Sequence, residues 1–312
     1  MIKQAVIQYN TIVNDKKTLG LVGLGVIAGN YYTGLTTSQK FNLVGVCDID
    51  ANAPSREMYK EYSFFDDYEK MVGLDYVAIT TNTASHYQVA RHFLEKGTNV
   101  ILEKPGTLYM HQLEELVAIA KGKGLYFDVV FHWQHGSEIE FLEKNLHKFG
   151  SIQKIHSEVL DPYTDTPNRI SDSKKHLKGC WLDSGVNQLS MISKFINLNG
   201  AKLVSKKHTL DKVQNQPSQS DVRFESKCDV DITLHLNWNT QTNNKSSQFI
   251  TDKGTLDILH SQQAVLFDGE QVFLDDSMPR LQRHYYNYFT KFTKVDSTGD
   301  ILNVHKLLFD GE

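Results

Sequence analysis

The feature that most constrains the fold of this chain is a set of small residues placed directly after an apolar segment. Residues 19–24 have the composition of a buried strand and run into Gly23-Leu24-Gly25-Val26-Ile27-Ala28. In a strand–turn–helix unit, Gly23 permits the tight turn, Gly25 lets the backbone approach a pyrophosphate, and Ala28 lets the helix pack closely. The free N–H groups of the helix N-terminus attract the phosphates. The contacts expected with a dinucleotide come from Gly23, Gly25, Val26 and Ile27.

An acidic residue stands where the second part of such a site requires one. Asp48 ends the next apolar segment, about 20 residues after Ala28, and a carboxylate at this position accepts hydrogen bonds from the adenine ribose. It also repels a 2′-phosphate, so NAD is the expected cofactor. Ile49, the next residue, is a further expected contact of the cofactor. Arg56 lies downstream and could reach a phosphate, which leaves NADP open. The alternative interpretation is an ordinary glycine-rich turn with an incidental aspartate.

The first part of the chain alternates short apolar runs with helical stretches. Regular alternation of this kind predicts right-handed crossovers and a parallel sheet covered on both faces. We therefore expect a doubly wound α/β Rossmann domain over residues 1–131, in which 1–16 form an extension whose segment Ala5–Tyr9 is either an edge strand or a tail. The expected strands are residues 19–24, 43–47, 76–80, 99–102 and 126–131, and the clearest helical stretches are 88–96 and 109–121.

Beyond about residue 150 the pattern changes to apolar–polar alternation, which is typical of strands with one buried face. A chain of 312 residues exceeds the usual length of one domain. We therefore expect a second, α+β domain over residues 132–312, built on a large and mostly antiparallel sheet. Residues 215–221 are expected to form a polar loop. The expected strands are 152–160, within 222–238, 247–251, 255–259, 264–267 and 271–274, and the expected helices are 184–197 and 280–295.

Composition excludes several other classes of protein. The formal net charge of −4 argues against a nucleic-acid partner, which selects for a positive face. The three cysteines have neither disulfide nor metal-site spacing, so no metal is expected. No secretory signal and no apolar run of about 20 residues stands out. We expect a soluble, cytoplasmic protein without a membrane partner.

Two further motifs complete a family pattern. Thr81-Asn82-Thr83-Ala84-Ser85-His86 follows the third strand, and residues 97–105 end in Glu103-Lys104-Pro105. With the glycine loop, these motifs resemble the glucose–fructose oxidoreductase/inositol dehydrogenase/rhizopine-catabolism superfamily, whose signature is T-x-N-x-x-H followed by G-K-x-V-x-x-E-K-P. Thr83 departs from it, because the family usually has Asn there. The resemblance implies cofactor contacts from Thr81, Asn82, His86, Glu103 and Lys104.

A motif in the second half narrows the resemblance. Most members of the superfamily carry D-x-x-x-H on a helix over the nicotinamide, but here Asp183 is followed by Asn187. This form resembles the aldose 1-dehydrogenase branch, whose members oxidise D-galactose or L-arabinose at C1. His132 at the domain crossover and Asp161 after the first strand of the second domain also fit that branch. Gln134, in place of a usual arginine, and a loop without tryptophans at residues 163–178 depart from it.

The resemblance implies a catalytic role for Lys104, Asp183 and Asn187. It also implies that these three residues and His132 contact the sugar. Lys104 would contact O1 of the sugar and act as the base, its pKa lowered by desolvation and by the positive nicotinamide. Asp183 would hold or accept the proton instead. Asn187 does not titrate and can only orient the hydroxyl. Because an anomeric hydroxyl is more acidic than a ring alcohol, an amide at this position is compatible with oxidation at C1.

Other interpretations of these residues stay open. Lys104 could be a surface lysine, Asp183 a helix cap, His132 a crossover residue satisfied by backbone, and His86 a packing residue near the cofactor. For the whole chain, the alternatives to an aldose 1-dehydrogenase are a dehydrogenase or reductase acting at another carbon of a sugar or cyclitol, and a dinucleotide-binding regulator without turnover. The resemblance also implies a homodimer or a dimer of dimers, formed through the open face of the second sheet.

Overall fold

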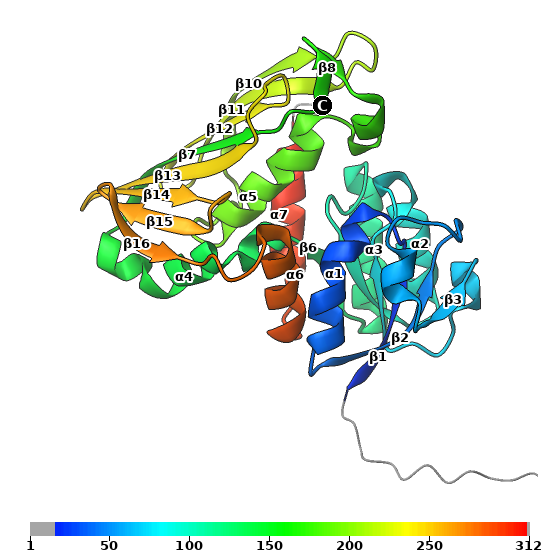
Figure 1. Ribbon diagram of the computed structural model, residues 1–312. Coiled ribbons are helices and arrows are strands. Elements are labelled where there is room, and N and C mark those ends of the chain that lie inside the picture. Colours follow the sequence, from blue (N-terminus) through cyan, green and yellow to red (C-terminus); the bar gives the residue numbers. More distant parts are fainter. Residues whose placement is uncertain (1–15, 311–312) are drawn as a thin grey trace, which may run out of the picture.

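The computed structural model describes residues 16–310, and its strands form two large sheets (Figure 1). The first sheet is parallel throughout and has the strand order β3-β2-β1-β4-β5-β6. Its strands are β1 (Lys17–Val22), β2 (Phe41–Cys47), β3 (Ser63–Phe65), β4 (Tyr76–Ile79), β5 (Asn99–Glu103) and β6 (Phe127–Val130). This order reverses between β1 and β4, where Rossmann domains bind ligands at the carboxyl ends of the strands. The predicted doubly wound domain is confirmed.

Helices connect these strands as the crossovers require. They are α1 (Val26–Thr37), α2 (Thr83–Glu95) and α3 (Met110–Lys123). α1 begins three residues after Gly23, so its N-terminus lies at the carboxyl end of β1. The third strand, β3, was not predicted, because three residues at a sheet edge give too short an apolar signal.

The second sheet has eight strands in the order β10-β11-β12-β7-β13-β14-β15-β16. Only the β12–β7 pair is parallel, so the prediction of a mostly antiparallel sheet is confirmed. The strands are β7 (Ile152–Leu160), β10 (Lys202–Leu210), β11 (Pro217–Glu225), β12 (Asp231–Asn237), β13 (Asn244–Thr251), β14 (Thr255–Leu259), β15 (Ala264–Phe267) and β16 (Glu270–Leu274). A small hairpin, β8 (Thr164–Thr166) with β9 (Arg169–Ile170), stands beside it.

Helices cover one face of this sheet. Figure 1 shows α4 (Ser137–Phe149) and α5 (Val186–Ser193) on that face, and no helix of residues 16–310 on the other. β13 alternates accordingly, with Lys245, Ser247 and Phe249 buried and the residues between them half-buried. The chain then closes with α6 (Arg280–Thr290) and α7 (Thr298–Phe309).

The prediction of a polar loop at residues 215–221 is wrong, because β11 begins at Pro217. Ser218 and Ser220 point into the protein and are fully buried, so polar side chains occupy the inner face of this strand. The strand pairs with β10, which the sequence analysis also missed. Serines and lysines hide the alternation in these two strands, and pairing with β12 decides the conformation of β11.

The helix predictions also need correction at their ends. The helix expected over residues 280–295 stops at Thr290, and a separate helix, α7, follows it. The helix expected from Ser184 is preceded by a π-helical turn, η5 (Trp181–Gly185). The indole of Trp181 donates to the carbonyl of Leu308 at 2.7 Å, which ties this turn to the C-terminal helix. The alternatives for Ala5–Tyr9 lie outside the described residues.

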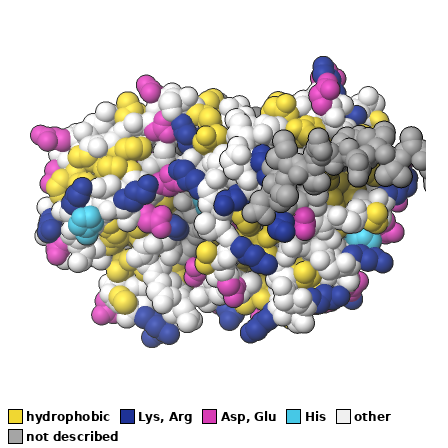
Figure 2. All heavy atoms as spheres, turned by 90° about the horizontal axis from the view of Figure 1, so that it is seen from below, with side chains coloured by type: hydrophobic (Ala, Val, Ile, Leu, Met, Phe, Trp, Pro, Cys, Tyr) yellow, Lys and Arg dark blue, Asp and Glu magenta, His cyan; other side chains and the backbone are white. Residues whose placement is uncertain are grey.

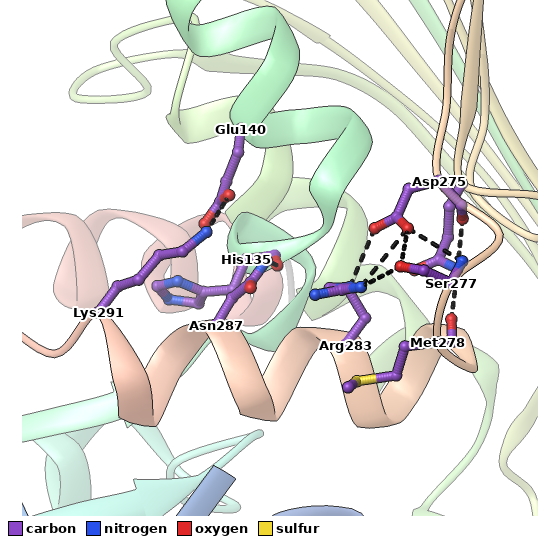
Figure 3. A network of polar contacts seen from close by, with 9 residues as sticks. His135, Glu140, Asp275, Ser277, Met278, Arg283, Asn287 and Lys291 are labelled. Carbon is purple, nitrogen blue, oxygen red and sulfur yellow. Dashed lines mark hydrogen bonds and ion pairs between the residues drawn. The ribbon is translucent and has the colours of Figure 1, made fainter. Parts of the chain in front are cut away.

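α6 joins the two sheets by packing on α1, as Figure 1 shows. A Cβ at Gly34 would lie 2.6 Å from the Tyr285 carbonyl oxygen, so only glycine permits this approach. The rings of Tyr31 and Tyr285 meet with centroids 4.3 Å apart. On its other side, α6 is held by polar contacts: Asn287 donates to the carbonyl of His135 at 2.9 Å (Figure 3). The C-terminal helices therefore fix the two sheets relative to one another.

The surface and the cysteines follow an ordinary pattern. On the face seen in Figure 2, basic and acidic side chains are interspersed. The three cysteines, Cys47, Cys180 and Cys228, are all free. Among residues 16–310, no helix is both long enough and apolar enough to cross a lipid bilayer.

Candidate active site

The glycine loop has the geometry that a pyrophosphate site needs. Gly23 has φ +98°, and a Cβ there would lie 2.6 Å from the backbone nitrogen of Thr81. Gly25 is the residue before α1, and a Cβ there would have nothing within 4 Å. No side chain caps α1, so its first N–H groups lack intrahelical partners. The fold requires glycine at Gly23, whereas Gly25 keeps the space in front of the helix clear.

Asp48 lies beside this loop. Its Oδ2 accepts from the backbone N–H of Leu24 at 2.6 Å, and its Oδ1 accepts from Asp50 N at 2.9 Å. Two large apolar residues next to these groups are open to solvent. Val26, the first residue of α1, is 78% exposed, and Ile49, which follows Asp48, is 92% exposed. An open helix N-terminus, a fixed carboxylate and exposed apolar side chains together fit a dinucleotide.

The residues of the T-x-N-x-x-H motif lie at the end of β4 and the start of α2. Thr81 is half-buried, and Asn82 is exposed directly before α2. His86 is buried, with Nδ1 3.1 Å from the Pro105 carbonyl oxygen and Nε2 3.0 Å from that of Thr81. Burial lowers the pKa of His86 to about 4. His86 therefore links the two motifs as a neutral packing residue.

Glu103 anchors the turn that carries Lys104. Its carboxylate is buried and accepts from the backbone N–H of Lys104 and from the hydroxyl of Tyr285 on α6. Burial raises the pKa of Glu103 to about 7, although Lys104 and these hydrogen bonds act against the shift. The peptide bond between Lys104 and Pro105 is cis. Glu103 thus connects the C-terminal helices to the position of Lys104.

Lys104 meets Asp183 across the two domains. Its Nζ lies 2.7 Å from Asp183 Oδ1 and 3.0 Å from the Asp183 carbonyl oxygen, and both side chains are largely buried. Burial opposes the charge of Lys104, but the carboxylates of Asp183 and Glu103 outweigh it, so the pKa of Lys104 is raised. The expectation of a lowered pKa is wrong for the chain by itself. Lys104 is not an exposed surface lysine either.

Asp183 does not cap a helix, so the alternative interpretation of this residue as a helix cap is wrong. It lies within the π-helical turn η5, and no side chain caps that turn. Asn187, one turn later on α5, donates to the Asp183 carbonyl oxygen at 3.3 Å. The Oδ1 atom of Asn187 is buried and has no hydrogen-bond partner among residues 16–310. An acceptor is therefore left free beside Lys104 and Asp183.

His132, which the sequence analysis expects to contact the sugar, packs against α6. It is buried at the start of η3 (His132–His135), with its Nδ1 2.9 Å from Nδ1 of His284, and its ring stacks on Tyr285 at 5.4 Å. Burial lowers the pKa of His132 well below its usual value. A neutral histidine in this position supports α6.

A second buried ion pair belongs to this site. Lys245 Nζ lies 2.5 Å from Asp161 Oδ1. The charge of Asp161 acts on Lys104, and that of Asp183 acts on Asp161 and Lys245, so these groups form one charged cluster. The sequence analysis missed Lys245 and Tyr285. The signal for Lys245 was its position on the inner face of β13, where a lysine needs a partner.

Comparison with known proteins identifies the family of the first domain. Residues 17–131 match the family model of an oxidoreductase family with an NAD-binding Rossmann fold, GFO_IDH_MocA. An inositol 2-dehydrogenase/D-chiro-inositol 3-dehydrogenase of Lactiplantibacillus plantarum is 23% identical over 225 residues, 69% of this chain and 63% of that protein. The uncharacterized oxidoreductase YhhX of Escherichia coli is 37% identical over 71 residues, 22% of this chain. That match spans only 21% of YhhX.

A solved structure extends the likeness to the whole fold. UDP-N-acetylglucosamine 3-dehydrogenase GnnA from Acidithiobacillus ferrooxidans superposes with a TM-score of 0.77 at 16% identity, covering 94% of this chain and 95% of that one. The first domain is therefore an NAD-binding Rossmann domain, and both domains occur together in the same order elsewhere. Residues 17–131 therefore form the NAD-binding Rossmann domain of the GFO_IDH_MocA oxidoreductase family, the glucose–fructose oxidoreductase/inositol dehydrogenase/rhizopine-catabolism group that the sequence motifs resemble.

Proposed function

We propose that this chain is an NAD(P)-dependent sugar dehydrogenase that oxidises the C1 hydroxyl of a cyclic aldose to a lactone. The observation that carries the proposal is the buried contact between Lys104 and Asp183 at 2.7 Å, with the free acceptor of Asn187 beside it. Lys104 follows a Rossmann strand, and Asp183 belongs to the second domain. A sugar held against both would lie between the two domains.

In the proposed reaction, the charges of Lys104 and Asp183 determine where the proton of the sugar hydroxyl goes. The cofactor, when bound, supplies the acceptor for the hydride that leaves C1. Because the pKa of Lys104 is raised, its ammonium group donates a hydrogen bond to O1 and stabilises the negative charge that develops there. Asp183 is positioned to accept the proton that O1 loses, or to take it through Lys104. The lysine–aspartate pair thus provides both stabilisation and a proton acceptor.

Asn187 favours the anomeric carbon. Its amide does not titrate, and its free Oδ1 can only accept a hydrogen bond from the sugar. An anomeric hydroxyl is more acidic than a ring alcohol and needs a weaker base. The absence of a histidine at this position therefore supports oxidation at C1.

A panel of sugars tests the proposal. NADH and NADPH formation is followed with neutral aldoses, hexuronates and inositols, and the product is identified by mass and by hydrolysis of the lactone. Lactone formation that is lost in Lys104→Ala supports the proposal. Oxidation of inositols alone would contradict the C1 assignment, and tight NADH binding without turnover of any sugar would indicate a regulator.

A second candidate is oxidation at another carbon. The names of the inositol 2-dehydrogenase and of the UDP-N-acetylglucosamine 3-dehydrogenase favour it, since both act on ring alcohols. A stable keto sugar in place of a lactone would identify this reaction. The same product analysis therefore decides between the two candidates.

We also propose that the open face of the second sheet joins two copies of the chain. It carries a hollow of about 470 Å³ lined by polar side chains, among them His156, Glu158, His235 and Gln248. Sedimentation equilibrium gives the mass in solution. A dimer or tetramer that Gln248→Arg on this face dissociates to a lower mass supports the proposal. A monomeric wild-type protein contradicts it.

A further inference from the structure

Arg280, the first residue of α6, has no partner for its charge. Its guanidinium makes no hydrogen bond and no ion pair with any residue between 16 and 310, and its Nη1 is shielded from solvent. The contact that it does make is with a ring, since its guanidinium carbon lies 5.8 Å from the ring centroid of Trp133. A partly buried arginine without an anion is a costly arrangement.

The neighbouring arginine on the same helix shows the usual solution. Arg283 Nε lies 3.0 Å from Asp275 Oδ2, and its Nη2 donates to the Ser277 hydroxyl at 2.6 Å, as the dashed lines in Figure 3 show. Arg280 lies three positions before Arg283 on the same helix, yet only Arg283 is paired with a carboxylate of the described residues. Arg280 therefore makes no direct contact with a carboxylate of the described part of the chain.

Arg280 lies beside the proposed active site. Five residues along α6, Tyr285 donates to Glu103, the residue before Lys104, and five residues of helix span about 7.5 Å. Trp133 follows His132, whose partner His284 also belongs to α6. The charges of both Arg280 and Asp183 act on Asp161, which places the three groups around one site.

The two lysines near Arg280 are already paired with aspartates. Lys104 is paired with Asp183, and Lys245 with Asp161. Glu138 is the carboxylate that acts most strongly on Arg280, but it forms no ion pair with it, and its Oε1 faces His260 Nδ1 at 2.9 Å. The two lysines and two aspartates pair with each other, and the guanidinium is left without a direct contact to a carboxylate of residues 16–310.

We propose that Arg280 binds an anionic group of the substrate, and that the substrate is an aldose carrying a carboxylate at C6. A guanidinium holds a carboxylate through two parallel hydrogen bonds, and the Trp133 ring lies within cation–π distance of the Arg280 guanidinium. The inference rests on the proposed function for the identity of the reacting carbon. It names hexuronates as the substrate class.

Kinetics with matched sugars test the inference. D-Galacturonate and D-galactose differ at one carbon, which carries a carboxylate in the first and a neutral alcohol in the second. A phosphate ester of galactose is the third substrate and presents a phosphate in place of the carboxylate. We expect kcat/KM for galacturonate to exceed that for galactose by roughly 100-fold. Arg280→Gln should abolish this ratio by lowering only the uronate value. Arg283→Gln, which breaks an ion pair on the same helix, is the control and should keep the ratio.

Binding measured without turnover separates the two proposals. Calorimetric titration of galacturonate into the protein with NADH should show binding that Arg280→Gln removes and Arg283→Gln retains. Such binding without oxidation of any sugar would sustain the anion site and refute the dehydrogenase. Equal use of galactose and galacturonate, unchanged in Arg280→Gln, would overturn the anion site while leaving the dehydrogenase intact. Preference for the phosphate would overturn the choice of carboxylate.

Discussion

Lys104 and Asp183, 79 residues apart in the chain, meet through a hydrogen-bonded ion pair with Nζ 2.7 Å from Oδ1. Lys104 directly follows β5, whereas Asp183 lies in the π-helical turn η5, and neither side chain is exposed by more than 14%. In the proposed reaction, this contact supplies the proton acceptor and the positive charge together. It also explains why the separate motifs carrying these residues belong to one site.

Removal of the Asp183 carboxylate should change the pH dependence of the reaction. Asp183 raises the pKa of Lys104, whereas burial lowers it. In Asp183→Asn the pKa of Lys104 should therefore fall, so the alkaline limit of kcat/KM moves to lower pH, and kcat should drop by roughly 100-fold. A pH profile measures both effects. Asp172→Asn at an exposed ion pair is the control. An unchanged alkaline limit would contradict the role of Asp183.

Asn187→His should widen the range of substrates. The new imidazole has an ordinary pKa of about 6.5 and can act as a base toward less acidic ring alcohols. We expect oxidation of inositols to rise by about tenfold relative to aldoses, since general bases contribute at least that much. Initial rates on both classes give the ratio. If the ratio stays constant, the amide does not determine the reacting carbon.

The two glycines of the loop should respond differently to alanine. At Gly23, φ is +98° and the added Cβ would lie 2.6 Å from Thr81 N, so Gly23→Ala should lower the free energy of unfolding by about 1–3 kcal/mol. At Gly25 the Cβ meets open space, so Gly25→Ala should keep stability but weaken NADH binding by roughly tenfold. Thermal unfolding and NADH fluorescence measure the two quantities. Equal loss of stability in both variants would contradict this division.

Glu103 should make stability fall as pH rises. Burial raises its pKa to about 7 in the folded protein, above the usual 4.5, so folding favours the protonated acid. This contribution is complete below pH 4.5 and is lost as pH rises through 7. Glu103→Gln cannot titrate, and its free energy of unfolding should decline less over this window. Urea unfolding of both proteins at several pH values provides the comparison, and parallel curves would exclude the effect.

Asp48 should set the preference between the two cofactors. Its carboxylate is held at the loop by the N–H of Leu24 at 2.6 Å, where it would repel a 2′-phosphate. Asp48→Ser should raise the ratio of kcat/KM for NADP over NAD by about tenfold. Arg56→Ala is the companion variant, because Arg56 stacks on Phe64 at 4.6 Å and its Nη1 has no partner among the described residues. A lower NADP rate in Arg56→Ala alone would assign the preference to the arginine.

The site was only partly predictable because its residues differ in how they signal themselves. Gly23, Asp48 and Lys104 follow strands at fixed distances, so short-range spacing is enough to find them. Tyr285, Lys245 and Arg280 act through contacts with residues far away in the chain. Nothing in their own neighbourhoods distinguishes them from other tyrosines, lysines and arginines.

By itself, the sequence determined the parallel domain, the glycine loop and the motifs around Glu103 and Asp183, because apolar periodicity and turn chemistry are local properties. Tertiary structure decided that residues 217–221 form a strand, that Asp183 lies in a π-helical turn and that the Lys104 ammonium faces a carboxylate. These outcomes depend on pairing and charge across long sequence separations. The protonation of Lys104 follows from that pairing, since burial alone would have lowered its pKa.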